Sequence, residues 1–103
     1  MVVIVWRYRV RPGRESAFEA FYGPGGGWEL LMRRDVNWLS TRLLRDAQTP
    51  GVYLTFDEWR AAGDFEAFRA RHAAEYAALD AQGDGLTESE ERIGAFVSTA
   101  SPD

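Results

Sequence analysis

The segment GVYLTFDEWRAAGDFEAFRARHAAEYAALDAQ, residues 51–82, decides the fold because its hydrophobic period changes partway along. Up to residue 59, Val52, Leu54 and Phe56 alternate with Tyr53, Thr55 and Asp57, which predicts a strand. From residue 64 onward the apolar positions recur at helical spacing. They predict one long helix with a single buried stripe, formed by Phe65, Phe68, His72, Tyr76 and Leu79. A strand leading into such a helix is half of a split βαβ unit, so the other half should precede it.

The preceding residues supply that other half. Residues 2–10 predict a strand with Ile4, Trp6, Tyr8 and Val10 on one face, and residues 14–22 predict a short helix after an Arg-Pro-Gly turn. The glycine-rich run at 23–27 must end this helix. We consider two roles for the run: a corner between two helical segments, or a flexible lid that carries Trp28 over a pocket.

The remaining elements complete a βαββαβ order. Residues 37–46 predict a strand that a hairpin joins to the strand in the opening segment, and residues 91–97 predict the last strand. Thr87 and Glu90 have the spacing of a capping box, which predicts a helical turn before that strand. We therefore expect a ferredoxin-like α+β fold, with a four-stranded antiparallel sheet and both helices on one face. A single domain should span residues 1–98, with a disordered tail at 99–103.

The uncovered face of this sheet is predicted to be apolar. We assign to it six residues from the first three strands: Val3, Val5, Trp38, Leu44, Tyr53 and Trp59. Such a surface is too apolar to remain in water, so a second copy of the chain is expected to cover it as a homodimer. Arg7 and Asp57 are expected to form an ion pair within that interface.

Composition excludes several classes of function. The net charge of −4 and the lack of a basic run argue against a nucleic-acid surface. The chain has no cysteine and one histidine, which excludes thiolate chemistry and a histidine-rich metal centre. The apolar run at residues 2–6 is too short for a membrane span or the core of a signal peptide, so we expect a cytoplasmic bacterial protein.

Three segments together carry a family resemblance. VVIVWRYRVRPGRESAFEAFYG at 2–23, LLRD with YLTFDEW between 43 and 59, and AFRARHAAEYAALD at 67–80 resemble the antibiotic-biosynthesis-monooxygenase-like family of dimeric α+β barrels. That superfamily includes cofactor-free oxygenases acting on aromatic polyketides, haem-degrading monooxygenases, polyketide cyclases and members with no known reaction. The haem-degrading branch fits poorly, because Trp6 and Phe68 replace its strand asparagine and helix tryptophan, and His72 comes too early.

The cofactor-free oxygenase branch has no motif that transfers to single residues of this chain; an enzyme of that kind would have its site in a cavity between the long helix and the sheet. His72 is the candidate general base and Tyr76 the candidate hydrogen-bond donor. The candidate substrate-binding walls are aromatic: Trp6, Tyr8, Trp28, Phe56 and Phe68. Alternatively, His72 is a partly buried histidine bonded to a neighbour and the aromatic residues are ordinary core.

Two functions remain open. The first is a small monooxygenase that needs no cofactor and acts on an aromatic, polyketide-like substrate, with a cyclase as a variant. The second is a non-catalytic dimer that binds a small apolar ligand or a partner.

Overall fold

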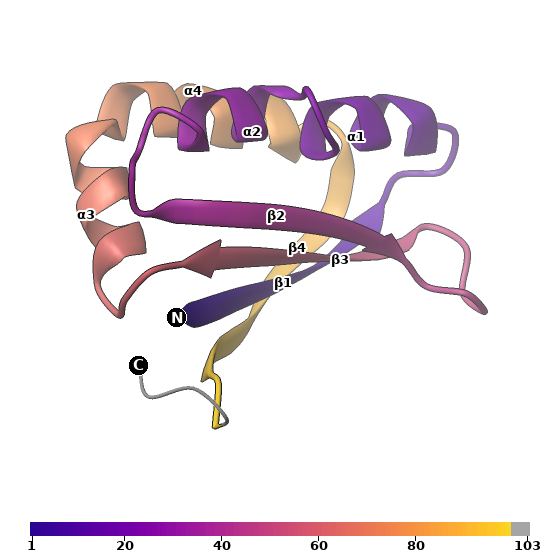
Figure 1. Cartoon of the computed structure of the whole chain (residues 1–103). Helices are drawn as coiled ribbons and strands as arrows, with labels where there is room; N and C mark the ends of the chain where they lie inside the picture. Colours follow the sequence, from indigo (N-terminus) through magenta and orange to yellow (C-terminus); the bar gives the residue numbers. More distant parts are fainter. Residues whose placement is uncertain (100–103) are drawn as a thin grey trace.

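The computed structural model, which describes residues 1–99, contains one antiparallel sheet with its helices packed on one face (Figure 1). The strands are β1 (Val2–Val10), β2 (Trp38–Arg45), β3 (Val52–Trp59) and β4 (Thr87–Val97), and they lie in the order β2-β3-β1-β4. The helices are α1 (Glu15–Tyr22), α2 (Gly27–Met32), α3 (Asp64–Arg71) and α4 (Ala73–Asp84). The ferredoxin-like prediction is therefore confirmed. Most of the predicted tail lies outside the described residues.

The register of β1 against β3 determines which side chains face the helices. Ile4 lies opposite Asp57, and Tyr8 lies opposite Tyr53. Directly opposed residues point to the same face of a sheet, so Asp57 and Tyr53 face the helices, whereas Phe56 faces away from them. The predicted places of these three residues were wrong. The apolar positions of β3 had suggested its core face, but the larger aromatic side chains of the opposite face fill the core instead.

Trp59 and Trp38 also belong to the helix side. Trp59 is completely buried between Phe65 and Phe68, with ring centroids 5.9 and 5.2 Å away. Trp38 pairs with Trp59 across β2 and β3 and packs against the same core. Both had been predicted on the uncovered face. The predicted ion pair between Arg7 and Asp57 is excluded as well, because the two side chains lie on opposite faces of the sheet.

The predicted long helix is broken at His72, which has non-helical dihedral angles of φ −117° and ψ 35°. In a straight helix, Phe65 and Tyr76 would be separated by a rise of about 16 Å. Here their ring centroids are 6.0 Å apart. The break turns α3 down beside the sheet while α4 lies across it (Figure 1), so that aromatic rings from both helices meet over one part of the sheet.

β4 begins at Thr87, so the predicted helical turn is absent and the strand is longer than expected. Thr87 pairs with Val10, and Glu90 pairs with Tyr8 in the sheet. The Thr87 hydroxyl donates to the carbonyl of Gly83 at 3.5 Å, which is a bond back to the end of α4 rather than a helix cap. Sheet pairing along β1 therefore outcompetes the local capping signal.

The glycine-rich run forms a tight corner between α1 and α2. Gly25 has a φ of +79°, a backbone conformation that favours glycine. At Gly26 a Cβ atom would lie 2.2 Å from the carbonyl oxygen of Phe21, so only glycine fits. The corner directs Trp28 inward, where only 9% of its surface is exposed.

The face of the sheet that carries no helix is largely apolar. It is formed by Val5, Leu44, Leu54, Phe56, Ile93 and Phe96, with Arg7 and Arg42 among them. Phe96 is 51% exposed and Ile93 46% exposed. A hollow of about 550 Å³ lies on this face and is lined by residues of all four strands. Within the described residues, no helix has the length and apolar character needed to cross a membrane.

Candidate functional site

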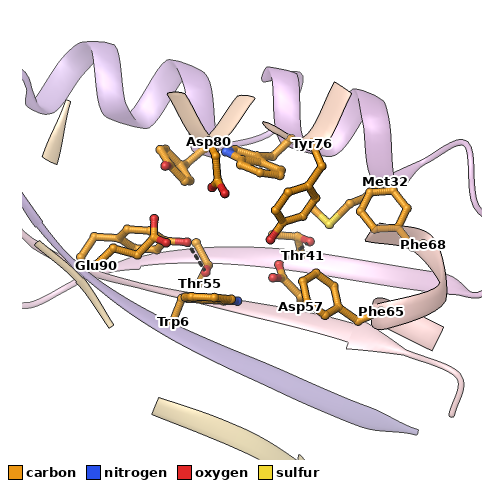
Figure 2. A pocket seen from close by; sticks show the side chains of 13 residues that line it. Trp6, Met32, Thr41, Thr55, Asp57, Phe65, Phe68, Tyr76, Asp80 and Glu90 are labelled. Atoms are coloured by element: carbon orange, nitrogen blue, oxygen red, sulfur yellow. Dashed lines mark hydrogen bonds between the residues drawn. The ribbon is translucent and has the colours of Figure 1, made fainter. Parts of the chain in front are cut away.

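A cavity lies between the helix side of the sheet and the helices above it (Figure 2). The strands contribute Trp6, Tyr8, Thr41, Thr55, Asp57 and Glu90. The helices contribute Tyr22, Trp28, Met32, Phe65, Phe68, Tyr76 and Asp80. Its enclosed free space is about 30 Å³, while the whole hollow including its opening to solvent is about 460 Å³. The cavity therefore combines a mainly aromatic wall with a few polar groups, as small-molecule sites do.

Asp57 is the most deeply buried carboxylate of the cavity, with 7% of its surface exposed. Its Oδ1 atom accepts a hydrogen bond of 2.9 Å from the hydroxyl of Thr41. Burial raises the pKa of Asp57 to about 6, and the Thr41 hydrogen bond counteracts part of that rise. A carboxylate with a pKa near 6 is mostly ionised at neutral pH yet basic enough to accept a proton.

Tyr76 lies on the opposite wall, and its hydroxyl points toward Asp57 and Thr41 (Figure 2). Its side chain is buried, and the guanidinium carbon of Arg69 lies 4.7 Å from the centre of its ring. Burial raises the pKa of Tyr76 well above its ordinary value, and the charge of Asp80 acts in the same direction. Tyr76 therefore stays protonated at physiological pH and is available as a hydrogen-bond donor.

The remaining polar groups make the cavity electronegative. Burial raises the pKa values of Asp80 and Glu90. The repulsion between neighbouring carboxylates adds to this effect, and the charge of Arg69 opposes it. Among the residues that the structure describes, no arginine lines the cavity. Thr55 donates a long hydrogen bond of 3.4 Å to the Tyr8 hydroxyl at the floor. The charged residues among those that line the cavity are all acidic, so the cavity suits a ligand that enters in a neutral or positively charged form.

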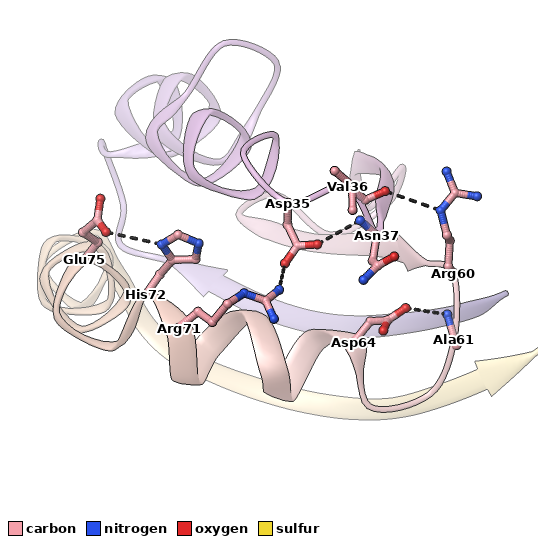
Figure 3. A network of polar contacts seen from close by, with 9 residues as sticks. All are labelled: Asp35, Val36, Asn37, Arg60, Ala61, Asp64, Arg71, His72 and Glu75. Atoms are coloured by element: carbon pink, nitrogen blue, oxygen red, sulfur yellow. Dashed lines mark hydrogen bonds and ion pairs between the residues drawn. The ribbon is translucent and has the colours of Figure 1, made fainter.

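The structure gathers five of the seven predicted site residues around this cavity. These are Trp6, Tyr8, Trp28, Phe68 and Tyr76. Phe56 lies on the other face of the sheet, as described above. His72 lies at the junction of α3 and α4, where its ring packs on Phe68 at 5.3 Å and its Nδ1 atom is 3.4 Å from Glu75 (Figure 3). The predicted general base is therefore outside the cavity, and the alternative of a histidine bonded to a neighbour describes its position.

A polar network holds the loop after α2 against α3 (Figure 3). The side chain of Asp35 is 2% exposed, and it accepts hydrogen bonds from the Arg71 guanidinium and from the backbone N–H of Asn37, the latter at 2.8 Å. Arg34 adds an ion pair of 2.6 Å with Glu75 on α4. These contacts connect the helical layer to the entrance of β2 and so support one side of the cavity.

The sequence analysis missed Asp57 and Thr41 as members of the site. Asp57 had been placed on the dimer face because the alternation in β3 was read with its faces exchanged. A usable signal was present. Tyr53 and Trp59 are an even number of positions from Asp57 and so lie on the same face of the strand, and large aromatic residues belong more often in a core than on an open face. Thr41 gave no signal of its own, because its importance depends on its place opposite Asp57.

Comparison with known proteins bears on the fold. No protein-family model matches the chain, and no curated protein matches it. Among solved structures, this chain is similar to SnoaB, a cofactor-independent oxygenase from Streptomyces nogalater. The two sequences are 21% identical, the match covers 99% of this chain and 97% of that chain, and the TM-score is 0.72. An antibiotic biosynthesis monooxygenase is 13% identical, with 96% and 99% covered and a TM-score of 0.69.

A NIPSNAP domain protein from Burkholderia xenovorans is equally similar in structure. It is 20% identical, both chains are covered completely, and the TM-score is 0.70. Proteins described as oxygenases and proteins described only by a domain thus share this architecture. The chain has the fold of the antibiotic biosynthesis monooxygenases, which confirms the predicted resemblance at the level of the fold.

Proposed function

We propose that the chain is a small oxygenase that needs no cofactor and acts on an aromatic ketone bearing an activated CH₂ group. The observation that carries this proposal is a buried carboxylate, Asp57, that faces an aromatic cavity opposite a protonated Tyr76. Oxidation by molecular oxygen without a cofactor requires a substrate that can be deprotonated to an electron-rich anion. A desolvated base and a nearby donor are the groups that such a step needs.

The proposed reaction begins with transfer of a proton from the substrate CH₂ group to Asp57. The resulting carbanion is delocalised as an enolate, and the Tyr76 hydroxyl donates a hydrogen bond to its oxygen. The anion transfers electrons to O₂, and the carbon forms a hydroperoxide with the proton returned. Loss of water then leaves a new carbonyl group. The balance is CH₂ + O₂ → C=O + H₂O, so the substrate is oxidised and O₂ is reduced.

The aromatic residues have a supporting role in this proposal. Trp6 forms the floor below the carboxylates, and Phe65 and Phe68 form the end wall beside Tyr76 (Figure 2). They would stack against a planar substrate and exclude water from the anion. An enclosed space of about 30 Å³ is smaller than one aromatic ring requires, so ring binding needs a side chain to move. Met32 is the most readily displaced, because its side chain is unbranched and flexible.

The small enclosed space also favours a second candidate function. A cavity that side chains already fill is what a non-catalytic protein with this fold would have. In that case the chain would bind a small apolar ligand, and Asp57 would contribute recognition rather than proton transfer. The two candidates differ in whether removing the Asp57 charge abolishes a reaction or only alters binding.

The test measures O₂ consumption with a hydroxylated anthrone, after subtraction of the rate without protein. The wild-type protein should accelerate conversion to the quinone, and ¹⁸O₂ should place one labelled oxygen in the new carbonyl. Asp57→Asn should lower kcat by about 10²- to 10⁴-fold, and Tyr76→Phe by about 10²- to 10³-fold. His72→Gln is the matched control and should keep the wild-type rate, because His72 lies outside the cavity.

Two results would reject the oxygenase. One is an Asp57→Asn protein with the wild-type rate. The other is wild-type protein that binds the corresponding anthraquinone, which cannot react, yet never accelerates oxidation of the anthrone. The second result would establish the binding function instead.

We also propose that a second copy of the chain covers the uncovered apolar face. Val5, Leu54 and Phe56 lie at its centre, where two sheets could pack face to face. The homodimer is tested by light scattering at micromolar concentration. Phe56→Glu should produce a monomer, whereas Leu30→Glu should not, because Leu30 is 58% exposed on α2 on the other side of the molecule. A wild-type monomer at that concentration would contradict the proposal.

A further inference from the structure

Three side chains on neighbouring strands form a hydrogen-bonded series beneath the cavity. The indole N–H of Trp38 donates to the Thr41 hydroxyl oxygen at 3.0 Å, and the Thr41 hydroxyl donates to Oδ1 of Asp57 at 2.9 Å. Thr41 on β2 lies directly opposite Asp57 on β3. The series therefore runs along β2 and crosses to the carboxylate on the adjacent strand.

An irregularity in β2 makes this series possible. In a regular strand, residues three positions apart point to opposite faces, so Trp38 and Thr41 could not both lie on the helix side. The register shifts between Trp38 and Ser40, because Trp38 pairs with Trp59 and Ser40 pairs with Glu58, which leaves Leu39 without a partner in β3. This β-bulge turns Trp38 to the same face as Thr41. Bulges often serve to redirect a side chain near a functional site.

The direction of each hydrogen bond is fixed by chemistry. The indole nitrogen can only donate, so Thr41 must accept from Trp38. The single hydroxyl hydrogen of Thr41 is then free for Asp57, which can accept it best when ionised. Oδ1 of Asp57 is thereby occupied. Within residues 1–99, the second oxygen of Asp57 has no hydrogen-bond partner in the protein.

We infer that Trp38 and Thr41 are positioning residues that fix Oδ1 of Asp57 by a hydrogen bond and leave its second oxygen for the ligand. The bulge at Leu39 is the backbone feature that assembles them. The inference rests on the proposed function insofar as Asp57 acts as the base. Its first test needs no substrate, so the two can fail separately.

The test follows the ionisation of Asp57 by the ¹³C NMR signal of its carboxyl carbon. Thr41→Val keeps the shape but removes the donor, and it should raise the pKa of Asp57 by about one unit. Thr41→Ser keeps the hydroxyl and should retain the wild-type value, which separates the hydrogen bond from mere packing. Trp38→Phe frees the Thr41 hydroxyl to rotate and should give a smaller rise in the same direction.

The decisive comparison is the double variant. If Trp38 acts through Thr41, adding Trp38→Phe to Thr41→Val should change the pKa of Asp57 no further. An equal effect of Trp38→Phe with and without the Thr41 hydroxyl would overturn the inference. So would an unchanged pKa in a folded Thr41→Val protein, or failure of Thr41→Ser to keep the wild-type value.

The same variants connect the inference to activity. With the anthrone assay, Thr41→Val should move the acidic limb of the kcat/KM profile to higher pH by the amount measured by NMR. If the NMR shifts occur but no variant of the protein, including the wild type, oxidises the anthrone, the positioning stands and the oxygenase proposal fails. If the protein oxidises the anthrone but the pKa of Asp57 measured by NMR is the same in the wild type and all variants, the oxygenase proposal stands and the positioning inference fails.

Discussion

Replacing Asp57 by asparagine should make the protein more stable at neutral pH, although it removes the proposed base. Burial raises the pKa of Asp57 from 3.8 to about 6, which means that the folded protein disfavours the charged carboxylate. Between these two values the folded state binds more protons than the unfolded state. The free energy of unfolding therefore falls as the pH rises from about 4 to about 6.

The size of the effect follows from the shift. About 2 units at about 1.4 kcal/mol each give a destabilisation of about 3 kcal/mol once Asp57 is fully ionised. Asparagine has nearly the same shape, and its carbonyl oxygen can still accept from Thr41. Burial of its amide group costs about 1 kcal/mol. We expect Asp57→Asn to stabilise the fold by about 2 kcal/mol at pH 7.5, and to destabilise it by about 0.5 kcal/mol at pH 4, where little of the Asp57 charge remains to be removed but the amide still has to be buried.

The assay is urea unfolding of both proteins at pH 4 and pH 7.5, at one protein concentration so that self-association is held constant. Asp46→Asn is a control of opposite sign, because backbone N–H groups of Gln48 and Thr49 lower the pKa of Asp46. The Asp46→Asn substitution should lower the free energy of unfolding at pH 7.5. A loss of stability in Asp57→Asn at pH 7.5, or a gain that is equal at both pH values, would refute the reasoning.

Three further predictions follow from other parts of the structure. Gly26→Ala should lower the free energy of unfolding by about 3 kcal/mol, measured by urea unfolding, because its Cβ atom would meet the carbonyl oxygen of Phe21 at 2.2 Å. Asp35→Ala should cost about 2 kcal/mol in the same assay, because it removes a buried acceptor from Arg71 and from a backbone N–H. In calorimetric titrations 1-naphthol should bind at least tenfold more tightly than 1-naphthoate, since only carboxylates and neutral groups line the cavity; equal affinities would contradict its electronegative character.

Hydrophobic period was enough to predict the order of the elements and the topology of the sheet. The change of period near residue 60 separates β3 from α3, and glycine or proline marks most of the other boundaries. The family resemblance, drawn from segments in β1, β3 and the helices, likewise agrees with the fold of the solved structures. These features are local, so they can be recognised from short segments of the sequence.

The assignment of β3 to its two faces could not be obtained in the same way. Both faces of that strand carry apolar side chains, so alternation identifies two sets without saying which set meets the helices. The answer lies in the register, which places Tyr53 opposite Tyr8 and Asp57 opposite Ile4. One exchange of faces moved Asp57 from the cavity to a supposed interface. His72, a histidine on the predicted buried stripe of the helix, then remained as the candidate base.

The two departures from regular structure that were least predictable both adjoin the cavity. The break at His72 brings Tyr76 back over Phe65 and across from Asp57, whereas a continuous helix would place it far away. The bulge at Leu39 turns Trp38 toward Thr41. Neither has a glycine or proline to mark it. Sequence and structure disagree most often where function imposes its own geometry, and here both disagreements support the same carboxylate. A protein with this fold but an unbroken helix and a regular β2 would keep the core and lose the arrangement around Asp57, so the fold alone does not imply the proposed activity.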